Sequence, residues 1–203
     1  MKRVILHWTA GTNVVSALDR QHYHRIVDGE GSVFAGVWPI EANERINPKG
    51  PVTYAAHTLN CNTGAIGVAL AGMKGAVEAP FSAGLYPINE LQLRAAAQLV
   101  AYLCRQYRIP VSPTTVLTHA EVQRTLGIAQ RGKWDIARLP WRPDLVGARP
   151  VGDHIRALVS AEMTPAVYEP APVAVTGGSD PEPVGFLALI LAALRGLFGP
   201  KGA

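Results

Sequence analysis

Two of the six histidines follow directly on short apolar segments that are typical of buried strands. His7 comes after the apolar residues 4–6, and His119 comes after residues 116–118. If these strand ends are neighbours, an aspartate beside the two imidazoles would complete a zinc site, which needs neutral imidazole nitrogens and an anionic ligand. The spacing alone also allows ordinary polar or hydrogen-bonded histidines, which are more frequent, and the chain contains no HExxH motif.

The elements that must position these histidines are predicted from hydrophobic periodicity, caps and turn residues. Strands and helices are interspersed along the chain, which indicates an α/β or α+β class. The predicted strands are residues 3–8, 65–70 and 116–118, and a hairpin is predicted at 24–35 around the glycines of 29–31. The predicted helices are residues 13–22 with Asn13 as the N-cap, 89–108, and 153–162.

The helix over 89–108 has the clearest pattern in the chain. Asn89 with Gln92 resembles a capping box, and Ile109-Pro110 ends the helix. Its apolar stripe is expected to face the core. The stripe consists of Leu91, Ala95, Leu99, Tyr102 and Leu103.

Composition limits the class of protein. Of 203 residues, 48% are hydrophobic and 17% are charged, which argues against a disordered, charge-rich chain. The net charge of +4 favours an anionic partner without choosing among nucleic acid, cell-wall polymer and a membrane surface.

Cys61 and Cys104 are too few for a disulfide framework and are expected to be reduced. The apolar run at the N-terminus is too short for a cleaved leader, so we expect synthesis in the cytoplasm.

The composition shifts near residue 164. Residues 164–183 are rich in Pro, Gly, Ala and Val and are expected to be an extended linker. Residues 184–203 form an apolar tail, in which the helix expected at 184–198 would be about 22 Å long, shorter than the roughly 30 Å hydrocarbon core of a bilayer. Contact with a membrane surface and packing on protein are both open for this helix.

Five short motifs occur in an order that is typical of one enzyme family. Together they resemble the zinc-dependent N-acetylmuramoyl-L-alanine amidases of type 2, a superfamily that includes the phage amidase-type lysozymes and the peptidoglycan-recognition proteins. Each motif is weak alone, whereas five in order are a strong signal. The motifs are LHWTAGT at 6–12, HYHRIVDGEGSV at 22–33, the segment from AHT at 56–58 to IGVALAG at 66–72, THAEV at 118–122 and KWD at 133–135.

The resemblance implies an α/β fold in which a mixed central sheet is flanked by helices, spanning residues 1–163. It also implies a zinc ion and places the metal ligands on His7, His119 and Asp135. A zinc-bound hydroxide would then hydrolyse the amide between N-acetylmuramic acid and L-alanine in peptidoglycan. The resemblance gives catalytic roles to Tyr23 and Lys133, and it places Thr9, His57 and Asn60 on the substrate.

The chain departs from the family pattern at three places. Ala69 stands where the cytoplasmic muropeptide amidases have a glutamate, which favours the phage-type Tyr and Lys pair. The stretch from His119 to Asp135 is longer than usual, with residues 123–132 inserted or rearranged, and Ile136-Ala137 replaces the expected Pro-Gly, which makes Asp135 the least secure ligand. His57 or His24 would be the nearest substitute.

We therefore expect an endolysin-like peptidoglycan hydrolase that acts on the cell wall. Two alternatives stay open at this point: a cytoplasmic amidase that recycles muropeptides, and a peptidoglycan-binding module without catalysis. Nucleic-acid binding is not expected, because no platform of aromatic and basic residues accompanies the positive charge.

Overall fold

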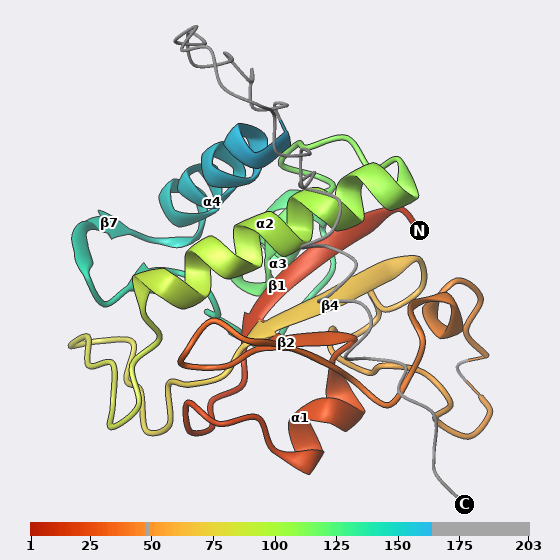
Figure 1. The fold of residues 1–203 in the computed structure, drawn as a ribbon, viewed down its shortest axis with the longest axis horizontal. Helices are drawn as coiled ribbons and strands as arrows, with labels where there is room; N and C mark the ends of the chain where they lie inside the picture. The colour runs from red at the N-terminus through yellow and green to blue at the C-terminus, as the bar shows by residue number, and fades with distance from the viewer. Residues whose placement is uncertain (48, 164–203) are drawn as a thin grey trace, which may run out of the picture. The chain divides into compact units, whose positions relative to one another are not determined.

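A mixed sheet forms the centre of the computed structural model, which describes residues 1–47 and 49–163 (Figure 1). Neighbouring strands in this five-stranded sheet are parallel, except that β3 pairs antiparallel with β2. This architecture confirms the predicted fold class. The strand order is β3 (Val33–Ala35), β2 (Arg25–Val27), β4 (Ala65–Leu70), β1 (Arg3–Trp8) and β5 (Val116–Thr118).

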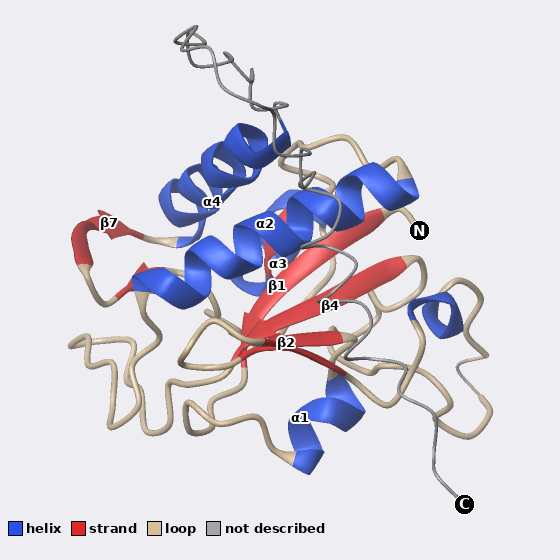
Figure 2. Cartoon of the chain, viewed as in Figure 1, coloured by secondary structure: helices blue, strands red, loops and turns tan. Residues whose placement is uncertain are grey.

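Helices cover both faces of the sheet (Figure 2). The long helices α2 and α4 pack on each other and share the main core with β1 and β4, whereas α3 packs beneath β1 on the other face. The remaining elements are short and lie between them. The bounds are α1 (Ala17–His22), the 3-10 helix η1 (Ile40–Asn43), α2 (Glu90–Tyr107), α3 (His119–Leu126), the hairpin strands β6 (Arg138–Leu139) and β7 (Arg142–Val146), and α4 (Ala148–Met163).

Side-chain alternation along β1 decides which residues face the site. Val4, Leu6 and Trp8 belong to the core shared with α2 and α4. Successive side chains of a strand point to opposite faces, so Ile5 and His7 face the other side. His7 is therefore directed away from the main core, on the face that α3 covers.

Helices α1 and α4 begin at other residues than predicted. α1 begins at Ala17 with Ser16 as the N-cap, so the predicted start at Asn13 is wrong. Asn13 instead donates hydrogen bonds from Nδ2 to the carbonyl oxygens of Ala71 (3.2 Å) and Pro87 (3.0 Å), which holds it outside the helix. α4 begins at Ala148, five residues before the predicted start.

The predicted capping box of α2 is confirmed, but its predicted buried stripe is wrong in part. Leu91 and Tyr102 are 57% and 55% exposed. The helix is rotated relative to that stripe because the buried amide of Gln92 donates hydrogen bonds to the carbonyl oxygens of Val27 (3.2 Å) and Ala71 (2.9 Å). The fully buried apolar residues are Leu93, Ala96, Ala97, Val100, Ala101, Leu103 and Cys104.

Two sequence predictions concern the C-terminal part of the chain. The linker at 164–183 and the apolar tail at 184–203 lie outside the described residues. Within residues 1–47 and 49–163, no helix has the length and hydropathy that crossing a membrane would require.

A buried ion pair joins α4 to the strand end that precedes His119. Arg156 contacts both carboxylate oxygens of Glu121 at 2.8 and 3.0 Å and also donates to the carbonyl oxygen of Val116 at 2.9 Å. Glu121 in turn accepts a hydrogen bond from the backbone N–H of Thr118 at 2.9 Å. Breaking such a buried pair is costly, because it leaves an uncompensated charge in the interior.

We predict that Gly152→Ala destabilises the protein, although alanine normally stabilises a helix by roughly 0.5–1 kcal/mol relative to glycine. A Cβ at position 152 would lie 2.2 Å from the carboxylate of Glu121, so the ion pair would have to shift. We expect a loss of roughly 2–4 kcal/mol of unfolding free energy in urea denaturation. A stability equal to or above that of the unchanged protein would contradict this explanation.

His24 is fully buried at the start of the hairpin, and its ring lies against β4. Its Nδ1 accepts a hydrogen bond from the N–H of Gly67 at 2.9 Å. Burial lowers its pKa from 6.5 to about 4, with a further lowering by the charge of Arg25 that Glu41 opposes. Between these two pH values the unfolded chain binds a proton at His24 that the folded chain does not bind.

We therefore predict that the metal-free protein loses stability as the pH falls from about 6.5 to 4. The His24 contribution is roughly 3 kcal/mol, which follows from the size of its pKa shift. Urea unfolding at several pH values in the presence of a chelator measures this loss, and His24→Gln should reduce the dependence by the His24 contribution because glutamine cannot be protonated. An NMR titration of the folded protein in which His24 becomes charged near pH 6.5 would contradict the prediction.

Candidate metal centre

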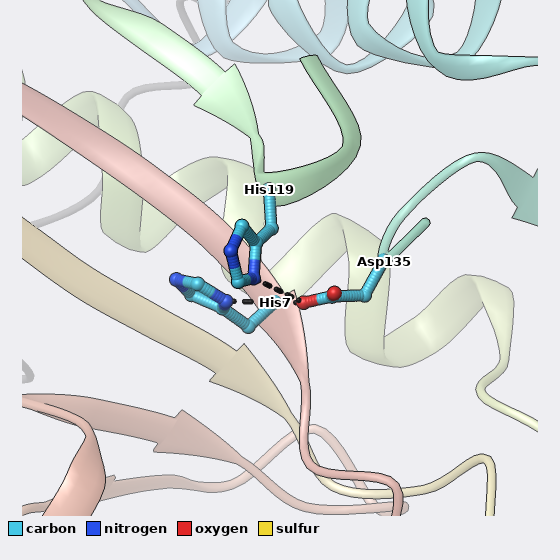
Figure 3. A group of neighbouring side chains, drawn as sticks. All are labelled: His7, His119 and Asp135. Carbon is cyan, nitrogen blue, oxygen red and sulfur yellow. Dashed lines mark hydrogen bonds and ion pairs between the residues drawn. The ribbon is translucent and has the colours of Figure 1, made fainter. Parts of the chain in front are cut away.

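Three buried side chains converge at one point, as Figure 3 shows. The Nδ1 atoms of His7 and His119 lie 3.0 and 3.1 Å from the same oxygen of Asp135, Oδ2. All three ligand atoms lie within 4.8 Å of one another. The structure thus brings together the three predicted metal ligands, including Asp135, which the sequence placed least securely.

The parallel strands explain why His7 and His119 lie close together. His7 is the penultimate residue of β1, and His119 is the first residue of α3, directly after β5. Since β1 and β5 are adjacent and parallel, both histidines lie at the same edge of the sheet. The sequence alone did not establish that these two strands are neighbours, and the structure shows that they are.

Asp135 is held in place by its two neighbours along the chain. The ring of Trp134 packs edge-on against Trp8 of β1, with ring centroids 4.6 Å apart, and Ile136 is fully buried in the main core. The carbonyl oxygen of Asp135 also accepts a hydrogen bond from the N–H of Ala120 at 2.6 Å. The buried Ile136 therefore anchors the segment in which the expected Pro-Gly is missing.

The second nitrogen of each histidine also has a partner. His119 Nε2 lies 2.8 Å from Oε1 of Gln130. His7 Nε2 lies 3.2 Å from Nδ1 of His57 and 3.4 Å from the hydroxyl oxygen of Thr58. Metal-binding histidines in proteins almost always have such a contact, which orients the ring.

The small residues of β4 make room for the histidine rings. Gly67 and Ala69 are opposite Ile5 and His7 in the register of the sheet. A Cβ at Gly67 would lie 2.7 Å from the ring of His57. Ala69, where the family resemblance places a glutamate in the cytoplasmic muropeptide amidases, is fully buried.

The charges in this cluster suit a divalent cation. Burial is the main cause that lowers the pKa of His7 to about 4, so its imidazole is neutral at neutral pH. Burial alone would raise the pKa of Asp135, but its contacts with His119 and His7 outweigh burial and leave the pKa below its ordinary value. Two imidazoles and a carboxylate, all aimed at one point, are the donor set of a zinc site, and the residues fit this metal.

Tyr23 lies directly beside the cluster. Its ring centroid is 5.2 Å from that of His7. Burial, with a smaller contribution from Asp135 and Asp19, raises the pKa of the phenol above its ordinary value. The hydroxyl is therefore protonated at neutral pH and is a hydrogen-bond donor.

An open cavity of about 480 Å³ lies next to the cluster and reaches His119. The exposed residue Lys133 lies on its rim, two positions before Asp135. His57 and Asn60, which the sequence placed on the substrate, also line this cavity. Arg131 adds a second cationic side chain to the lining.

Thr9 has a different environment from the other predicted substrate residues. Its hydroxyl oxygen accepts hydrogen bonds from the N–H groups of Gly11 and Gly72, both at 3.1 Å. It is not among the residues that line the cavity beside His119. A contact of Thr9 with substrate stays a prediction.

Sequence analysis missed Gln130 and Thr58, which contact the second nitrogens of the two histidines. Thr58 belongs to the AHT motif at 56–58, from which no such role was predicted, and Gln130 belongs to none of the five motifs. Gln130 lies in the segment 123–132, where the chain departs from the family pattern. The only signal was the unusual length of that segment.

The chain was compared with known families, curated proteins and solved structures. The comparison with curated proteins finds no match. The N-acetylmuramoyl-L-alanine amidase LysC from Clostridium intestinale URNW has 17% identity and a TM-score of 0.44, covering 78% of this chain and 85% of that chain. The Ph2119 endolysin from the Thermus scotoductus MAT2119 bacteriophage Ph2119 has 15% identity and a TM-score of 0.45, covering 77% and 83%.

A family model gives the decisive match. The model for N-acetylmuramoyl-L-alanine amidases matches residues 1–137, which include His7, His119 and Asp135. This match spans most of the chain and ends two residues beyond the converging aspartate. The chain therefore belongs to the N-acetylmuramoyl-L-alanine amidase family.

Proposed function

We propose that this protein is an endolysin-like peptidoglycan hydrolase that cleaves the amide between N-acetylmuramic acid and L-alanine with a zinc ion held by His7, His119 and Asp135. The observation that supports it most is the convergence of three buried ligand atoms within 4.8 Å of one another. Membership of the amidase family supports the reaction type. When bound there, zinc would act as a Lewis acid and would make a nucleophilic hydroxide available at neutral pH.

Two side chains of the chain itself would assist the reaction. Attack on the amide carbonyl generates negative charge on its oxygen, which a cationic or phenolic donor can stabilise. Lys133 supplies an ammonium group at the rim of the cavity. The protonated hydroxyl of Tyr23, beside His7, would orient the attacking water or donate a proton.

The cavity beside the cluster would hold the substrate. Its lining combines the polar side chains of His57 and Asn60 with the cationic side chains of Arg131 and Lys133. A peptide stem carries carboxylates, which guanidinium and ammonium groups bind by charge-assisted hydrogen bonds. We assign the peptide stem to this cavity on the basis of that complementarity.

Ala69 favours wall hydrolysis over muropeptide recycling. The side chain that would replace the glutamate of the recycling enzymes is a methyl group, fully buried and paired in register with His7. A methyl group cannot transfer protons, so that work would fall to Tyr23 and Lys133. A wall hydrolase should act on intact sacculi, whereas a recycling amidase should act only on soluble anhydro-muropeptides. Assays with both substrates therefore separate the two functions.

We predict that the purified protein binds one zinc ion and releases dye from labelled sacculi. Chelation should abolish release and added zinc should restore it, because the proposed reaction needs the metal to supply its nucleophile. Mass spectrometry of the digest should find free L-alanine amino termini on the released peptides. His7→Ala and His119→Ala should lose both the metal and the activity.

The matched control is His154→Ala, which removes a histidine of α4 outside the cluster and should change neither zinc content nor dye release. Dye release that persists in the chelated enzyme would refute the zinc mechanism. Binding of sacculi without any release by the zinc-loaded protein would identify a non-catalytic binding module instead.

We further predict that Lys133→Ala keeps zinc and lowers kcat by about 10²–10³, the typical effect of removing one oxyanion donor. Tyr23→Phe should also keep zinc and slow turnover, because only the hydroxyl is removed. Steady-state kinetics together with metal analysis test both variants. Lys2→Ala, just before the opposite end of β1 from His7, serves as the control. An unchanged kcat in either active-site variant would remove that residue from the reaction.

A further inference from the structure

The side chain of Gln130 contacts one of the three converging side chains, His119. Its side chain is only 3% exposed, and its Oε1 lies 2.8 Å from Nε2 of His119. We propose that Gln130 is a positioning residue, which fixes the tautomer of His119 so that the Nδ1 lone pair points at the metal position. The inference deepens the proposed function, because it concerns the same zinc site.

The orientation of the Gln130 amide follows from its other contacts. Its Nε2 donates to the carbonyl oxygens of Leu59 at 2.9 Å and Ile128 at 3.3 Å. Carbonyl oxygens can only accept, so the NH₂ group must be on that side. Oε1 is then on the side of His119, where it too can only accept a hydrogen bond.

When the imidazole of His119 is neutral, the Oε1 acceptor of Gln130 determines which ring nitrogen carries the proton. Because Oε1 accepts, Nε2 of His119 must be the protonated nitrogen, and Nδ1 carries the lone pair. That lone pair faces Asp135 Oδ2 at 3.1 Å. In this tautomer the Nδ1 lone pair and the carboxylate oxygen can both bind a cation placed between them, so the arrangement prepares the site for a metal.

Without this acceptor, the other tautomer would be favoured. A proton on Nδ1 of His119 would donate to Asp135 and would occupy the position of the metal. Zinc would then have to displace that proton before it could bind, which lowers its affinity. Contacts of this kind typically contribute 10–100-fold to metal affinity or activity.

Gln130 also has a structural contact that must be separated from this effect. Its backbone N–H donates to Oε1 of Gln123 at 2.9 Å, and its carbonyl oxygen accepts from the N–H of Lys133 at 3.2 Å. It therefore helps to hold the loop that precedes Asp135. A variant that merely loosened this loop could also weaken zinc binding.

Three variants separate the acceptor from the loop contacts. Gln130→Met removes the acceptor and both amide donors, Gln130→Glu keeps an acceptor and removes the donors to Leu59 and Ile128, and Gln123→Met breaks the loop contact and does not touch His119. Zinc affinity is measured by competition with a chromophoric chelator. NMR of the ring nitrogens of His119 in metal-free protein at pH 7.5 reports the tautomer, and circular dichroism checks folding.

We expect Gln130→Met to bind zinc about 10–100-fold more weakly and to lose the Nε2–H tautomer of His119. Gln130→Glu and Gln123→Met should keep both the tautomer and most of the affinity. Equal losses in Gln130→Met and Gln130→Glu, or an unchanged tautomer in Gln130→Met, would overturn the inference. A wild-type chain that binds no zinc would instead refute the proposed function, while the tautomer measurement would still test the role of Gln130.

Discussion

The site depends on one carboxylate oxygen, Oδ2 of Asp135, which two imidazole nitrogens contact from different elements. All three side chains are buried, so water cannot compensate the lone pairs that meet there. A divalent cation at this point would bind all three ligand atoms, which lie within 4.8 Å of one another. The geometry therefore suits the proposed zinc ion.

The sheet fixes the positions of the two histidines in this arrangement. Because β1 and β5 are adjacent and parallel, His7 and His119 are fixed by backbone hydrogen bonds on the strands that carry or precede them. The neighbouring strand β4 contributes Gly67 and Ala69, whose small size leaves space for imidazole rings beneath the sheet. Larger side chains at these positions would fill that space, so the size of the β4 residues is a requirement of the site and not only of the core.

Much of this was predictable from the sequence, because strands and motifs are local patterns. The strands 3–8, 65–70 and 116–118 were found in that way. The resemblance to the amidase family named His7, His119 and Asp135 as metal ligands, and the structure brings these three side chains together. The start of α1 and the buried face of α2 were not, because they depend on hydrogen bonds between distant segments. Asn13 and Gln92 both donate to the carbonyl oxygen of Ala71, and no local pattern indicates such a contact.

The departures from the family pattern become intelligible in three dimensions. Ile136 stands where a turn residue was expected, yet its side chain is fully buried in the main core and holds Asp135 from one side. Trp134 packs on Trp8 and holds Asp135 from the other side.

The long segment before Asp135 also affects the surroundings of His119. It is long enough to leave α3, return beneath His119 and place the amide of Gln130 against the imidazole. A shorter connection with a rigid turn would fix the carboxylate by backbone geometry, whereas this chain fixes it by side-chain burial. In the role proposed for Gln130, the additional length also brings an acceptor to His119, so the sequence of the insertion would be constrained by the chemistry at His119 as much as by the path of the loop.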